Sequence, residues 1–220
     1  MSTYYRSETF VFNIKEGQPD FRCYEDLNDA HAPEKLSINK DIWAESSTEE
    51  REIIKRNLLK STIQFSRNGW AGITTEALLE LSGQPHLKFL CGENTSLDSW
   101  KFPDGEDGEA PWGYLCGFLL KSDDLKRTIA AIDQLFIWSL NNLDVISKST
   151  MLGGYDREEV SEAITNPITS ENPAGDENVT RGEDGDGPWF LYSWLHSVRQ
   201  VCHTALLCDQ AVLHTMDIPQ

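Results

Sequence analysis

The most strongly helical stretch of the chain is SDDLKRTIAAIDQLFIWSLNNLDVI, at residues 122–146. Asp123 and Asp124 follow Ser122 at its start, where carboxylates interact favourably with the positive end of a helix dipole. Apolar residues then recur every three or four positions, which predicts a helix with one buried face. That face is expected to hold Leu125, Ile129, Ile132, Leu135 or Phe136, Leu140 and Leu143.

Four further helices are predicted around this stretch. Ser47-Thr48-Glu49-Glu50 fits a capping box at the start of a helix over 47–67, which Asn68-Gly69 would stop. A shorter helix is expected over 75–82, ending at Gly83, and another near 157–163. Pro188 suits the first position of a long helix that would run to about Met216, because a missing N–H costs nothing there.

Two segments are predicted as strands. Residues 8–14 are β-prone and alternate in part, and residues 86–91 (HLKFLC) form the second candidate strand. The elements together predict an α+β, predominantly helical fold. A small sheet from the N-terminal half would pack against three or more longer helices. We expect residues 1–220 to form a single compact domain, with residues 151–187 as an acidic, loop-rich insertion.

Composition indicates an ordinary globular protein. The chain has 220 residues, of which 39% are hydrophobic, and no apolar run approaches the length of a membrane span. The N-terminal residues lack the pattern of a signal peptide. Five cysteines are scattered without a CxxC pair, which is typical of reduced thiols in a cytoplasmic protein. They are Cys23, Cys91, Cys116, Cys202 and Cys208.

The formal charge of −17 restricts the partners that the chain could bind. A nucleic-acid backbone or an anionic membrane would repel it, so we expect no direct contact with either. A basic protein surface or a cation would be attracted, and a purely solubilising role is the simplest alternative. Residues 151–187 alone hold ten acids against two arginines.

Two short acidic segments resemble each other. Residues 105–112 read GEDGEAPW and residues 182–189 read GEDGDGPW, so six of eight positions match. An Asp-Gln pair follows each at a similar distance, at 133–134 and 209–210, and both pairs are expected inside helices. The similarity is interpreted either as a duplicated loop-and-helix unit or as coincidence.

These segments supply the candidate binding residues. Their carboxylates could face a basic partner, and the two tryptophans could be interface anchors or core residues beneath their loops. Neither segment fits the spacing of an EF-hand, so we expect no metal site, and we expect no cofactor. The candidate partner-binding residues are Asp104, Glu106, Asp107, Glu109, Trp112, Glu183, Asp184, Asp186 and Trp189.

Histidine and cysteine chemistry receives less support. On a helix that reaches Met216, His196, His203 and His214 would share a polar stripe, but they would be too far apart along the axis for one ion. Cys202 would lie on the apolar side, as an inert thiol. The chain contains no GxSxG, HExxH, GxxxxGK[ST] or GxGxxG motif.

The leading hypothesis is therefore an acidic binding or inhibitor protein that engages a basic surface. The partner would be a nuclease, a toxin or a defence complex, and the protein would be of the immunity type or a nucleic-acid mimic. Two alternatives stay open. One is a small-molecule or metal-dependent enzyme with an acidic, Trp-lined pocket, and the other is an assembly subunit of a homo-oligomer.

Overall fold

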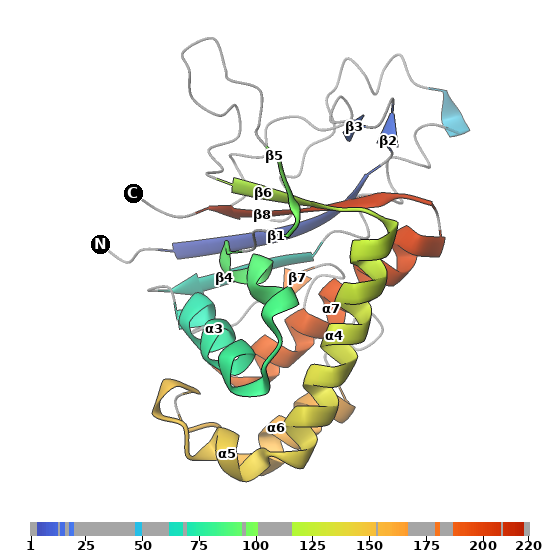
Figure 1. The fold of residues 1–220 in the computed structure, drawn as a ribbon. Helices are drawn as coiled ribbons and strands as arrows, with labels where there is room; N and C mark the ends of the chain where they lie inside the picture. Colours follow the sequence, from blue (N-terminus) through green and yellow to red (C-terminus); the bar gives the residue numbers. More distant parts are fainter. Residues whose placement is uncertain are drawn as a thin grey trace.

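A mixed β-sheet with helices packed against one face forms the described part of the molecule (Figure 1). The expected α+β class, with several helices against a sheet, is confirmed. The computed structural model describes residues 4–12, 14–15, 18–19, 47–49, 62–67, 70–93, 96–100, 116–152, 154–166, 179–180, 187–207 and 209–217.

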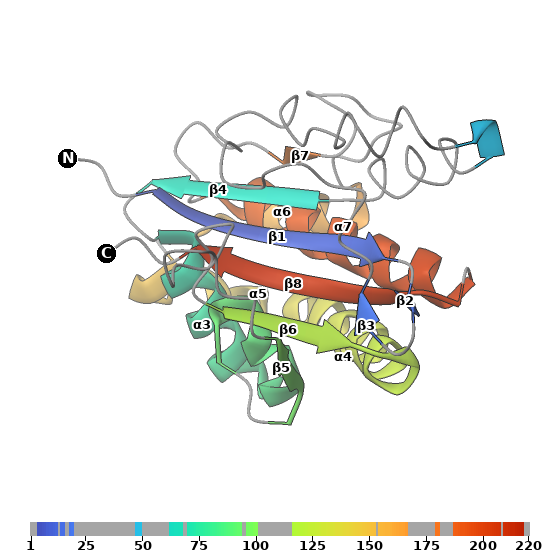
Figure 2. The same cartoon turned by 90° about the horizontal axis from the view of Figure 1, so that it is seen from above.

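Six strands form the main sheet in the order β5-β6-β8-β1-β4-β7 (Figure 2). Only the β4–β7 pair is parallel. The two central strands come from opposite ends of the chain, since Phe10 on β1 pairs with Leu213 on β8. A separate ladder joins β2 (Ile14–Lys15) to β3 (Gln18–Pro19). The main strands are β1 (Tyr4–Phe12), β4 (Thr62–Arg67), β5 (Asp98–Trp100), β6 (Cys116–Leu120), β7 (Val179–Thr180) and β8 (Ala211–Asp217).

The centre of the sheet is buried on both faces. Val212 belongs to the hydrophobic core, which is continuous with the helices. Leu213, the next residue along the strand, must point to the opposite face, yet it is also fully buried. Its register partner Leu119 is buried as well. The β8 strand therefore begins with a continuous buried run, Ala211 to His214, in place of an alternating pattern.

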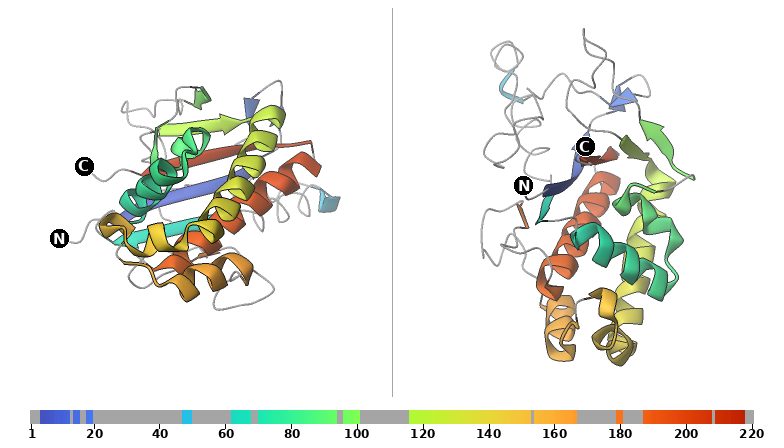
Figure 3. Two further views of the ribbon diagram at one scale, coloured as in Figure 1. Left: turned by 60° about the horizontal axis from the view of Figure 1, so that its bottom comes forward. Right: turned by 90° about the vertical axis from the view of Figure 1, so that its left-hand side faces the viewer.

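The longer helices lie together on one side of the sheet (Figures 1 and 3). Leu125, Ile132 and Leu135 of the central helix α4 are fully buried, as its periodicity predicts. Leu140 is a correction, because it was expected on the buried face and is 37% exposed. The helical segments are α3 (Trp70–Ser82), η4 (Pro85–Cys91), α4 (Ser122–Asn141), α5 (Leu143–Ser147), η5 (Thr150–Leu152), α6 (Arg157–Thr165) and α7 (Pro188–Leu207).

Two of the predicted helices match the structure, one in the residue where it ends and one over nearly its whole span. Helix α3 ends before Gly83, whose φ of 67° is the left-handed conformation that glycine adopts readily. Helix α6 spans Arg157–Thr165, close to the expected 157–163. The first predicted helix does start at residues 48–49, but residues 62–67 form strand β4 and not its last turns. The alternating order TIQFSR fits a strand, and pairing with β1 stabilises that choice.

The predicted strand at residues 86–91 is wrong. These residues belong to the 3-10 helix η4, which has Pro85 at its start. Gly92 closes it at a φ of 81°. Leu87, Phe89 and Leu90 are all buried and belong to the hydrophobic core.

The last predicted helix is also too long, since α7 ends at Leu207 and residues 211–217 form β8. Asp209 has a φ of 52°. The Gln210 N–H donates to the Ala205 carbonyl at 2.8 Å, and the Asp209 N–H donates to the Leu206 carbonyl at 3.3 Å. This is a Schellman ending with aspartate where glycine is usual, so the sequence carried no obvious stop signal.

The same ending bears on the internal similarity of the acidic segments. Asp133-Gln134 lies inside α4, as expected, but Asp209-Gln210 lies in the turn between α7 and β8. The segment at 182–189 leads directly into helix α7, whereas the first described element after residues 105–112 is strand β6. The two surroundings differ, which favours coincidence over duplication.

The helix ending predicts the response to substitution at Asp209. Asp209→Gly should raise the free energy of unfolding by about 0.5–1 kcal/mol, because glycine adopts positive φ without steric strain. Asp209→Val should lower it by about 1–2 kcal/mol. Urea unfolding followed by circular dichroism measures both. Gly83→Ala is the matched control and should cost about 1 kcal/mol, and equal stability of all three variants would contradict this account of the ending.

Candidate functional site

Most of the predicted partner-binding residues lie outside the described residues. This holds for Asp104, Glu106, Asp107, Glu109, Trp112, Glu183, Asp184 and Asp186, so their grouping stays a prediction. Trp189 is described in the first turn of α7, where it is half-buried and packs against the hydrophobic core. That position agrees with a core residue beneath the acidic segment more than with a fully exposed anchor.

The structure places a different set of carboxylates on one surface. They lie on α5 and α6, at the end of the helical layer farthest from the sheet (Figure 1). Lys148 and Arg157 are the cations of the same segment, residues 143–166. We call this surface the acidic end. Its carboxylates are Asp144, Asp156, Glu158, Glu159 and Glu162, and all five residues are exposed.

Local structure explains part of this charge. The Asp156 side chain caps α6, accepting from the N–H groups of Glu158 at 2.8 Å and Glu159 at 3.3 Å. Glu158 and Glu159 then lie in the first turn, where the helix dipole favours negative charge. Glu162 lies in the last turn, where the dipole disfavours it. Its charge therefore does nothing for the helix itself.

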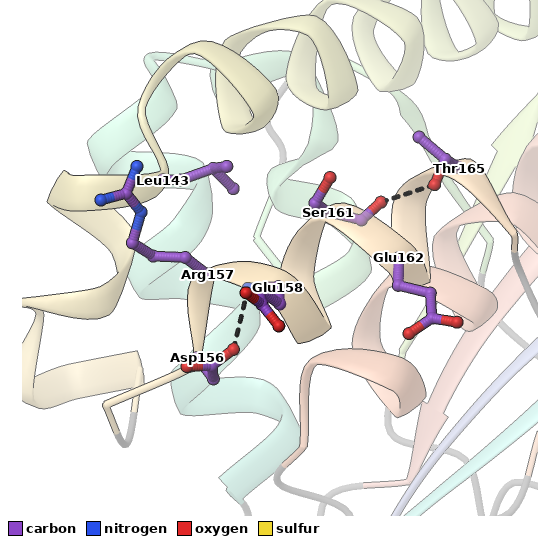
Figure 4. A pocket seen from close by; sticks show the side chains of 7 residues that line it. All are labelled: Leu143, Asp156, Arg157, Glu158, Ser161, Glu162 and Thr165. Carbon is purple, nitrogen blue, oxygen red and sulfur yellow. Dashed lines mark hydrogen bonds between the residues drawn. The ribbon is translucent and has the colours of Figure 1, made fainter.

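An open hollow of ≈ 610 Å³ runs along one side of α6 (Figure 4). Leu143, at the start of α5, is its apolar residue. Ser161 and Thr165 add hydroxyl groups, and the Thr165 hydroxyl donates to the Ser161 carbonyl at 2.8 Å. Four charged residues complete the lining, namely Asp156, Arg157, Glu158 and Glu162.

One ion pair crosses from α6 to α5 beside the hollow. An Arg157 guanidinium nitrogen lies 2.7 Å from an Asp144 carboxylate oxygen, with both side chains about 60% exposed. An exposed pair of this kind contributes about 0.2–1 kcal/mol and is weakened by salt. The Glu158, Glu159 and Glu162 side chains form no ion pair or hydrogen bond within the described part of the chain. Their charges are available to another molecule.

Apolar side chains are exposed where α4 turns into α5. Ile137 is 61% exposed, Leu140 is 37% exposed and Val145 is 44% exposed. Leu143, which lies between Ile137 and Val145 in the chain, lines the hollow. We call Ile137, Leu140 and Val145 the apolar corner. Of the three, Val145 belongs to the same segment as the carboxylates of the acidic end, residues 143–166.

Helix α7 holds the acidic end in place. The Nε2 of His196 donates to the Ile164 carbonyl of α6 at 2.9 Å, which assigns the proton to that nitrogen. The same ring lies against Phe136 of α4, with centroids 4.2 Å apart. Arg199 donates two hydrogen bonds to the Asp133 carboxylate of α4, at 2.6 and 3.1 Å. The three helices are therefore joined by directional contacts as well as by apolar packing.

The predicted histidine stripe is only partly correct. His196 and His203 lie on α7, but His214 lies on β8 and is fully buried. Its ring packs edge-on against Phe89, with centroids 5.2 Å apart. No group of three His, Cys, Asp or Glu residues within the described ranges could hold a metal ion.

Two thiols, the buried Cys202 and the half-buried Cys91, are un-ionised at neutral pH. Burial raises the pKa of Cys202 to about 12, as expected for its apolar side of α7. Burial, with smaller effects from Glu76 and Glu93, raises the pKa of Cys91 to about 12. His203, next to Cys202, is exposed while the thiol is buried, so the two do not form a dyad.

Sequence reasoning missed the acidic end. It placed α6 inside an acidic insertion and gave Glu158 and Glu162 no role. The signal was present, because two acids four residues apart on a predicted helix share one face. The ion pair and the adjoining corner of α4 and α5 could not be read from the pattern, because they depend on how three helices pack.

Comparisons with known proteins do not identify a class for this protein. No family model matches the chain, and neither the curated proteins nor the solved structures contain a significant match. Among the helices that the structure describes, none is both long enough and apolar enough to cross a membrane.

The buried histidine predicts a loss of stability in mild acid. Burial lowers the pKa of His214 from 6.5 to about 3. Below pH 6.5 the unfolded chain binds a proton that the folded chain does not, so stability should fall by about 1.4 kcal/mol per pH unit toward pH 3. His86 and His196 act in the same direction, because burial is also the main cause of their lowered pKa values.

Urea midpoints measured from pH 7 to pH 4 test this assignment. His214→Leu should flatten the pH dependence, because it removes the titrating group while keeping similar volume. The control His203→Gln changes an exposed histidine of α7 and should leave the slope as it was. An unchanged slope in His214→Leu would assign the acid sensitivity to other groups.

Proposed function

We propose that this protein is an acidic binding or inhibitor protein that engages a basic protein surface. The carrying observation is the net charge of −17, together with carboxylates on α6 that make no ion pair within the described part of the chain. A carboxylate that is neither paired nor needed for folding costs self-repulsion, so its presence favours a role outside the fold.

The mechanism follows from long-range electrostatics. A field of one sign steers a basic protein to the surface and raises the association rate by about 10- to 1,000-fold at low salt. Closely spaced carboxylates also resemble the charge density of a nucleic-acid backbone, so they could occupy a surface that holds phosphates. A nuclease, a toxin or a defence complex has such a surface. Against such a partner, this protein would act as an immunity protein or as a nucleic-acid mimic.

A second candidate, an assembly subunit, is supported by the apolar corner at Ile137, Leu140 and Val145. Apolar exposure of this kind is buried in oligomers, where salt does not weaken it. The two candidates therefore differ in salt response. A basic partner is released by salt, whereas an oligomer persists at high salt.

Capture of partners by the full chain at low and high salt tests the proposal. We expect a basic protein that binds at low salt and is released at high salt. A neutralised variant replaces the carboxylates of both acidic segments by amides. It should slow association about tenfold or more, with little change in dissociation. The neutralised residues are Asp104, Glu106, Asp107, Glu109, Glu183, Asp184 and Asp186.

The control variant is Glu76→Gln with Glu80→Gln. These two exposed acids are four residues apart on α3 and belong to neither of the segments under test. The control should keep the parental association rate to within about twofold. If neutralising both segments leaves the binding of every captured partner unchanged, the proposal fails. An oligomer that stays stable in high salt would instead support the assembly subunit.

A further inference from the structure

We draw no further inference here: the strongest candidate, the exposed apolar corner of Ile137, Leu140 and Val145 where α4 turns into α5, carries nothing, because no contact within the described part of the molecule shows what covers it.

Discussion

The pairing of β1 with β8 is the constraint on which the rest of the structure depends. These strands come from opposite ends of the chain and are hydrogen bonded over seven residue pairs, from Arg6–Asp217 to Phe12–Ala211. Both are interior strands of the main sheet, so everything between them must fold back as crossing helices and neighbouring strands. Such a pairing closes a very long loop, and its stability comes from burial of apolar residues at the centre of the sheet.

Burial on both faces of β8 explains several features together. Val212 and His214 face the helical layer, and Leu213 faces the other side, yet all are fully buried. A histidine in this position is neutral, because burial lowers its pKa to about 3. The same packing places the edge of His214 against Phe89 of η4, which gives that short helix a fixed contact with the sheet.

The helical layer carries the surface that the proposals use. Helices α4 and α7 form its base, and α6 is attached to both by His196 and the contacts around it. The acidic end is thus rigidly placed while its carboxylates stay in water. Partner binding can then use charge on a surface that does not have to be ordered, which favours fast association.

The sequence by itself determined the features that depend on neighbours along the chain. Helix α4 follows from its repeating apolar positions, the end of α3 from Gly83 and the short helix α6 from its periodicity and N-terminal acids. The large negative charge also needs no structure. These signals are local, since caps, left-handed residues and helical faces involve residues within a few positions.

Only the tertiary structure decided which segments became strands and which side chains reached the surface. The sequence pattern predicts that two helices continue through residues 62–67 and to about Met216. In the structure, residues 62–67 and 211–217 pair with β1 and form β4 and β8. Leu140 fits the buried stripe of α4, yet α4 ends at Asn141 and the residue lies exposed at the corner. The physical reason is that strand pairing and helix packing join residues far apart in sequence, and those contacts outweigh local preference.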